Sequence, residues 1–247
     1  MSEGEGKVMV ERRRAEAGSG VVAAPPLRPA AFRSDVRDGR RARAAAGRAA
    51  TGEGEGGAAD GASGTTEATT RPAAVRVSLP GVVGLLVLRA DPGRVPLAAA
   101  CRDALGLALP GPLDSIATGD RCLRWMSPDE WLLSCPAADT LALERALRDA
   151  LDGGGAITEV TGGYCVLRLE GPGVRELLAR STTLDVDPRA FPPGRVANST
   201  FARATATIRR IEGDVHELVV RRSFADYVAR WIAEATREGG LEVLVEH

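Results

Sequence analysis

The stretch CLRWMSPDEWLLSCPAADTLALERALRDALDGGGAITEV, residues Cys122–Val160, contains a hairpin, a helix and a further strand in close succession. Two short apolar runs flank the turn at Ser127–Asp129, and its Ser-Pro-Asp composition is typical of a hairpin turn. Leucines recur at helical spacing from Leu143 to Leu151, and glycines at 153–155 end the helix before the next strand. The segment therefore predicts the second part, ββαβ, of a βαββαβ unit.

The chain before this segment supplies the strand and helix that open the unit. The run GLLVLR at Gly84–Arg89 predicts a buried strand, and the turn residues at Asp91–Gly93 end it. Apolar residues recur on one helix face over Leu97–Leu105, and Gly106 follows as a C-terminal stop. Residues 84–160 are therefore expected to form one complete βαββαβ unit.

The same order of elements recurs in the rest of the chain. Tyr164–Glu170 alternates as a strand does, and the Gly-Pro-Gly turn at 171–173 opens a helix. A second hairpin turns at Gly213, and a last helix and the strand Leu241–Val245 follow it. The segment Cys122–Val160 aligns with Ala206–Val245, which predicts a second βαββαβ unit.

The last helix has a clear start and a clear apolar face in the sequence. Ser223 is placed to cap it, and Asp226 takes the position of a capping-box residue. Its apolar residues are expected to form one buried stripe. They are Phe224, Tyr227, Val228, Trp231, Ile232 and Ala235.

Two successive βαββαβ units predict an α+β fold made of two ferredoxin-like halves. We expect the two sheets to pack together around one core, in a domain that spans residues 73–247. Residues 1–72 are expected to form a disordered low-complexity tail. Ala, Gly, Arg, Glu, Ser, Thr and Pro dominate this tail, and Phe32 is its only aromatic residue.

Composition argues against several classes of protein. A formal net charge of −1 gives no electrostatic case for a nucleic-acid or membrane partner. No apolar run is long enough to span a bilayer, and the N-terminus lacks the apolar core of a signal peptide. The four cysteines lack metal or redox spacing, and none lies near a histidine. We therefore expect a cytoplasmic protein with reduced, partly buried thiols.

The sequence predicts no catalytic residue, no metal ligand and no cofactor-binding residue in this chain. The Gly-Pro-Gly turn follows a strand, as a phosphate-binding turn would. However, Pro172 lacks an N–H donor, and Glu176 takes the place of the third glycine. His216 has no acidic orienter nearby in the sequence that would support a role as a general base.

Four residues are candidates for a subunit interface. Trp125 and Trp131 flank the first hairpin turn, where packing in the core or at an interface is favoured over stacking on a planar ligand. Phe191 lies in a loop stiffened by three prolines, which suits an aromatic anchor for another protein. Arg222, the second of two adjacent arginines, either grips a carboxylate or covers the end of the second hairpin.

Six stretches between Leu88 and Thr236 resemble the gamma subunit of bacterial heterotetrameric sarcosine oxidase, and the last two are the most specific. In chain order they are LRADP (Leu88–Pro92), LGLALP (Leu105–Pro110), SPDEWLL (Ser127–Leu133), LEGPGVRELLA (Leu169–Ala179), LDVDPRAFPPG (Leu184–Gly194) and VRRSFADYVARWI (Val220–Ile232). Glu159, Thr161 and the segment Ser181–Thr183 depart from the pattern expected of the family.

The resemblance implies a fold similar to the folate-binding, aminomethyltransferase-like domain of the glycine-cleavage T-protein. It also implies a small accessory subunit in a complex with alpha, beta and delta subunits, of which alpha is expected to be the direct contact. The whole complex oxidatively demethylates sarcosine to glycine, with peroxide and methylenetetrahydrofolate as the other products. FAD, FMN, NAD and tetrahydrofolate are implied for the partner subunits, and no cofactor is implied for this chain.

Two other interpretations stay open at this point. One is a free-standing folate-binding or aminomethyltransferase-like protein, which binding of tetrahydrofolate to the isolated chain would distinguish. The other is a scaffold with no link to amine oxidation, and neighbouring genes for the other three subunits would count against it.

Overall fold

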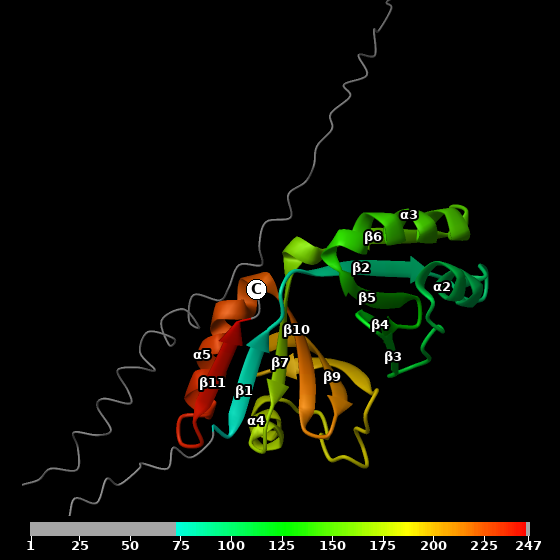
Figure 1. Cartoon of the computed structure of the whole chain (residues 1–247). Helices are drawn as coiled ribbons and strands as arrows, with labels where there is room; N and C mark the ends of the chain where they lie inside the picture. The colour runs from blue at the N-terminus through cyan, green and yellow to red at the C-terminus, as the bar shows by residue number, and fades with distance from the viewer. Residues whose placement is uncertain (1–72, 246–247) are drawn as a thin grey trace, which may run out of the picture.

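The computed structural model describes residues 73–245, so the predicted tail at 1–72 lies outside the described residues. The described part forms two β-sheets and four α-helices, joined in places by short 3-10 helices (Figure 1). The α-helices are α2 (Leu97–Leu105), α3 (Thr140–Leu151), α4 (Val174–Ser181) and α5 (Ala225–Ala235). The 3-10 helices are η1 (Ala137–Asp139), η2 (Thr161–Gly163) and η3 (Arg222–Phe224).

The five-stranded sheet, sheet B, contains the first βαββαβ unit. Its strands are β2 (Val83–Ala90), β3 (Ser115–Thr118), β4 (Arg121–Ser127), β5 (Glu130–Pro136) and β6 (Gly155–Glu159). They are ordered β3-β4-β5-β2-β6, and all neighbours are antiparallel. β2 is almost wholly apolar because both its faces are covered: Leu86 and Leu88 contact the helices, and Leu85 faces the other sheet.

The six-stranded sheet, sheet A, contains the second unit and one strand that precedes the first unit. Its strands are β1 (Val75–Leu79), β7 (Tyr164–Glu170), β8 (Val196–Phe201), β9 (Ala204–Glu212), β10 (Val215–Arg221) and β11 (Leu241–Val245). They are ordered β11-β1-β7-β10-β9-β8. β1 lies between β11, to which it is parallel, and β7, to which it is antiparallel. The first described strand therefore completes the sheet of the second unit.

The two sheets share most of one arrangement, but β1 separates β11 from β7 in sheet A, whereas β6 pairs directly with β2 in sheet B. In each, the second strand of the hairpin lies beside the first strand of the unit, and β6 and β11 are edge strands. The sequence analysis missed β3 and β8, and these extra strands also correspond. Each pairs with the first strand of the hairpin, at the opposite edge of its sheet. The βαββαβ order is thus present in both halves of the described chain.

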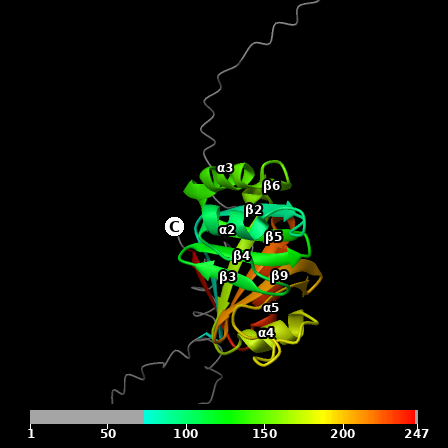
Figure 2. The ribbon, with the colours of Figure 1, turned by 90° about the vertical axis from the view of Figure 1, so that its right-hand side faces the viewer.

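Each half has its own hydrophobic core. Figures 1 and 2 show α2 and α3 beside sheet B, and α4 and α5 beside sheet A. A third and smaller cluster, centred on Leu85, Leu132 and Val219, lies where the two sheets face each other. The expectation of one shared core is therefore wrong. Each sheet buries one face under its own helices, and the opposite faces meet through this thin apolar contact.

Candidate functional site

Polar side chains lie between the two sheets, next to the third cluster. Arg124 of β4 is fully buried, and its Nε donates a 2.9 Å hydrogen bond to Oε1 of Glu217 on β10. Its Nη1 donates to the carbonyl oxygen of Cys122 at 3.2 Å and to Oγ of Ser134 at 3.0 Å. Because side chains alternate along a strand, these residues point away from the helical cores and toward the opposite sheet. We call this region the polar layer.

A second arginine joins the polar layer from sheet A. Nε of Arg209 on β9 donates a 2.9 Å hydrogen bond to Oγ of Ser115 on β3, and Nη1 lies 4.0 Å from Oε1 of Glu217. Oγ of Ser115 in turn donates to the carbonyl oxygen of Gly194 at 2.7 Å. Sequence analysis missed this layer, because its members come from strands far apart in the chain and no local pattern marks them.

The charged groups of the polar layer pair with one another inside the chain. Arg124 directs Nε and Nη2 to a single carboxylate oxygen of Glu217 and uses Nη1 for Ser134 and Cys122. Burial raises the pKa of the Cys122 thiol, so this group stays protonated and weakly nucleophilic at neutral pH. The arrangement is that of a buried ion pair that joins two sheets.

The two tryptophans predicted as interface candidates lie directly opposite each other on β4 and β5. Trp131 is only 3% exposed, and its Nε1 donates a 3.1 Å hydrogen bond to the carbonyl oxygen of Pro110. Trp131 is therefore a core residue, and its placement at an interface is wrong. Trp125 is partly buried against the same core and keeps an exposed part, so it stays a candidate.

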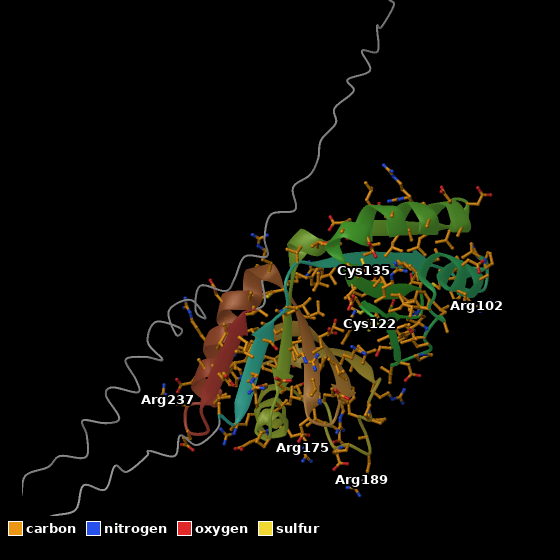
Figure 3. The ribbon with its side chains drawn as sticks, in the orientation of Figure 1. Arg102, Cys122, Cys135, Arg175, Arg189 and Arg237 are labelled. Atoms are coloured by element: carbon orange, nitrogen blue, oxygen red, sulfur yellow. The ribbon has the colours of Figure 1, made fainter. Side chains whose placement is uncertain are left out.

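The proline-rich loop after α4 folds toward the protein interior. Phe191 is 4% exposed, and its backbone N–H donates a 2.8 Å hydrogen bond to the carbonyl oxygen of Asp187. Nη1 of Arg210 donates to the carbonyl oxygen of Phe191 at 3.0 Å. The loop exposes Arg189 instead (Figure 3). The expectation that Phe191 is presented to a partner is therefore wrong, because these contacts turn the ring into the core of sheet A.

His216 is fully buried beside that ring. The two rings are nearly parallel, with centroids 6.5 Å apart, and neither nitrogen of His216 has a hydrogen-bond partner within the described part of the chain. Burial lowers the pKa of His216, so the imidazole is neutral at pH 7. A ring closed off from solvent is poorly placed to exchange protons with a substrate.

The start of α5 differs most from the sequence-based expectation. The 3-10 helix η3 precedes it, Phe224 takes the N-cap position, and the Ser223 side chain makes no capping hydrogen bond. Phe224 is 41% and Tyr227 is 37% exposed, although both were expected in the buried stripe. The residues that α5 buries are Ala225, Val228, Ala229 and Ile232. Two small alanines let the helix approach sheet A closely, which leaves the two aromatic rings outside.

Arg222 lies at the junction of the two halves. Its Nη1 donates a 3.2 Å hydrogen bond to the carbonyl oxygen of Gly162 in η2, which connects β6 to β7. Two residues that depart from the family pattern build the same junction. Glu159 accepts a 2.8 Å hydrogen bond from the Thr161 backbone N–H, and the Thr161 hydroxyl accepts one of 2.9 Å from the Leu85 N–H. Arg222 therefore joins the two halves through Nη1, and it stays a candidate for the subunit interface.

The Gly-Pro-Gly turn before α4 is explained by a close approach of the backbone. Gly171 has φ +118°, and a Cβ atom there would lie 2.6 Å from the carbonyl oxygen of Ala74. The Gly173 N–H donates a 2.8 Å hydrogen bond to that same oxygen. The chain leading into β1 therefore occupies the space that a phosphate would need, and this turn does not fit a nucleotide.

Metal sites, reactive thiols and membrane spans are the other features to consider in the described residues. Within 73–245, no three His, Cys, Asp or Glu side chains gather in a way that would hold a metal ion. All four cysteines are buried as free thiols, and Figure 3 shows Cys122 and Cys135 within sheet B. The helices of this part of the chain are too short or too polar to cross a membrane.

Comparison with known proteins identifies the family. The model of the sarcosine oxidase gamma subunit family matches residues 89–238. Sarcosine oxidase subunit gamma from Corynebacterium sp. (strain U-96) is 31% identical over 157 residues, which cover 62% of this chain and 75% of that protein. The subunit gamma from Arthrobacter sp. is also 31% identical, over 63% of this chain and 75% of its own length.

Solved structures agree with this assignment. A chain of the heterotetrameric sarcosine oxidase from Corynebacterium sp. U-96, in complex with pyrrole 2-carboxylate, matches with a TM-score of 0.62 and 28% identity. That match covers 66% of this chain and 84% of the other. The glycine cleavage system aminomethyltransferase T from Bartonella henselae shares the fold, with a TM-score of 0.50 and 16% identity over 70% of this chain and 48% of that one. The chain therefore belongs to the sarcosine oxidase gamma subunit family, and it is a gamma subunit of this oxidoreductase.

Proposed function

We propose that this chain is the small accessory subunit of a heterotetrameric complex, docked on the alpha subunit beside beta and delta subunits. It supplies a folded surface to the complex. The flavins, NAD and tetrahydrofolate belong to the partner subunits, and the whole complex demethylates sarcosine to glycine. The interface on this chain includes the partly exposed Trp125 and the region around Arg222.

The family match over residues 89–238 carries this proposal, since it covers most of the described part of the chain. Two observations support an accessory rather than a catalytic role. The charged groups of the polar layer, Arg124 and Glu217, are paired within the chain. The turn that most resembles a phosphate cradle is filled by the backbone at Ala74.

Co-expression with the other subunits of the complex tests the proposal. A tagged form of this chain should co-purify with alpha, beta and delta subunits, and the complex should produce peroxide from sarcosine. The isolated chain should be colourless, with no flavin absorbance in the visible range. A yellow isolated chain that oxidises sarcosine would overturn the proposal.

Equilibrium binding of tetrahydrofolate to the isolated chain separates the proposal from a folate-binding function. We expect no saturable binding up to about 1 mM tetrahydrofolate. Any binding would then be weaker than about 4 kcal/mol of free energy. A dissociation constant in the micromolar range would favour the folate-binding interpretation instead.

A further inference from the structure

Two aromatic side chains lie exposed among arginines at the start of α5. Phe224 and Tyr227 are 41% and 37% exposed, and their spacing of three residues places them side by side on the helix surface. Arg230 follows Tyr227 by the same spacing, and its side chain is exposed. Arg222 precedes Phe224 by two residues. We call Phe224, Tyr227, Arg222, Arg230 and the nearby Arg203 the aromatic–arginine patch.

The core of sheet A does not need these rings. α5 packs on the sheet through small and branched residues, and it leaves both aromatic rings on the outer side. The Tyr227 hydroxyl accepts a 3.2 Å hydrogen bond from the backbone N–H of Arg203, which lies in the turn between β8 and β9. This bond fixes the Tyr227 ring against the surface, so a partner would meet a rigid aromatic group.

Arginines outnumber acidic residues in the patch, although the chain as a whole has a net charge of −1. Three arginines lie near the two rings: Arg222 and Arg230 in the sequence, and Arg203 through the hydrogen bond from its N–H to Tyr227. Asp226 is the only acidic residue between 218 and 233. The Arg221 guanidinium lies 5.6 Å from the centre of the Tyr164 ring, and Arg222 is held on η2, so both are ordered at the surface.

We propose that the aromatic–arginine patch docks an acidic segment of another subunit of the oxidase. Phe224 and Tyr227 enter an apolar depression of that subunit, and Arg222 and Arg230 pair with carboxylates at its rim. Aromatic residues and arginine are the side chains that most often dominate binding at protein interfaces, and a local excess of positive charge selects an acidic partner. The inference rests on the proposed function, since it presupposes that the chain assembles with partner subunits.

Affinity measurements on the full chain and its partner subunits test the patch. The double variant Phe224→Ala, Tyr227→Ala should bind the partners at least about tenfold more weakly. Arg230→Glu should weaken binding comparably at low salt and less at high salt, because screening removes the electrostatic part. α3 offers matched controls, since Leu141 is 56% exposed and Arg145 is exposed. Leu141→Ala and Arg145→Glu should leave the affinity within about twofold of the unmodified chain.

Carbodiimide cross-linking shows whether a carboxylate of another subunit lies next to residue 230. Lys7 is the only lysine in the sequence, so Arg230→Lys adds a single primary amine to the described part of the chain. In the assembled complex, a carbodiimide should join this amine to an Asp or Glu of another subunit, which mass spectrometry of the product would locate. Arg145→Lys, the matched control on α3, should give no such product. A product that joins two copies of this chain would overturn the proposal.

The outcomes separate the patch from the proposed function. If the unmodified chain fails to co-purify with the other subunits, the proposed function fails. If it assembles and both the aromatic and the Arg230 variants bind normally, only the patch proposal fails. Tyr227→Phe keeps the ring but removes the hydroxyl that holds it to Arg203, so binding should weaken less than in the double aromatic variant. If the double aromatic variant has a lower melting temperature than the unmodified chain, its binding affinity is not used. The affinity of Arg230→Glu, which changes an exposed residue, then tests the patch.

Discussion

Arg124 and Glu217 form an ion pair that crosses from one β-sheet to the other. Nε of Arg124 lies 2.9 Å from Oε1 of Glu217, and the arginine is fully buried. One residue belongs to each βαββαβ half, so the pair links the two sheets beside the small apolar cluster and the Arg209–Ser115 hydrogen bond. A buried charge without its partner is costly, which makes this pair a sensitive point of the fold.

Removal of one partner of this pair should destabilise the protein strongly. Glu217→Ala leaves the Arg124 guanidinium buried and uncompensated, so the free energy of unfolding should fall by about 3–5 kcal/mol. Urea unfolding followed by circular dichroism measures this change. Arg237→Ala, which breaks an exposed pair with Glu234, should cost less than about 1 kcal/mol.

Replacement of both partners should cost less than loss of one. The double variant Arg124→Met, Glu217→Leu removes both charges and keeps apolar bulk between the sheets, so much of the lost stability should return. A double variant less stable than Glu217→Ala would show that the two residues act independently.

Stability should depend on pH through His216. Burial lowers the pKa of His216 in the folded state, whereas in the unfolded chain it titrates near about 6.5. The unfolded state therefore binds the proton first, and stability is full above about pH 6.5 and falls as the pH drops below it. The loss should approach about 1.4 kcal/mol per pH unit until the buried ring itself takes up a proton.

A variant that cannot titrate isolates this contribution. His216→Phe should flatten the difference in unfolding free energy between pH 7.5 and pH 5.5. His247, the only other histidine of the chain, is the same in both proteins, so the comparison reports on His216. Equal slopes in His216→Phe and the unmodified chain would contradict the assignment.

A methyl group at Gly171 should be poorly tolerated. Gly171→Ala forces a Cβ atom to within 2.6 Å of the Ala74 carbonyl oxygen and places alanine at φ +118°. The strain alone is worth about 1–3 kcal/mol, and it should appear as a lower melting temperature. Gly162→Ala has open space around it and should change the stability by less than about 0.5 kcal/mol.

The four thiols should be almost unreactive in the folded protein. Burial raises the pKa of Cys101 and of Cys165 to about 11. At pH 8 their thiolate fraction is then roughly two orders of magnitude below that of an ordinary cysteine. Ellman's reagent should label all four cysteines in urea and essentially none before unfolding. Rapid labelling of one native thiol would show an opening that this fold does not explain.

Elements with strong local periodicity could be predicted from the sequence, and elements defined by distant partners could not. The helix at Leu97–Leu105 and the first hairpin appear as expected, because their apolar spacing is dictated locally. β1 was missed, since its pairing with β7 and β11 depends on residues far along the chain. β3 and β8 are short or partly polar edge strands with weak alternation.

The same limit applies to the candidate site. Arg222 was predicted as an interface residue, and it stays a prediction. The direction of Phe191 depends on contacts with Arg210 and on the space beside His216, which no local pattern reveals. The polar layer is invisible for the same reason, because Arg124 and Glu217 meet only when both sheets are complete.

The position of β1 has a consequence for synthesis on the ribosome. All strands of sheet B follow one another without interruption, so that half can close while later residues are still being added. In sheet A, β1 lies between β7 and β11. Both of these strands are synthesised long after β1. β1 therefore stays unpaired until β7 has emerged, and its second edge is covered only when β11 follows.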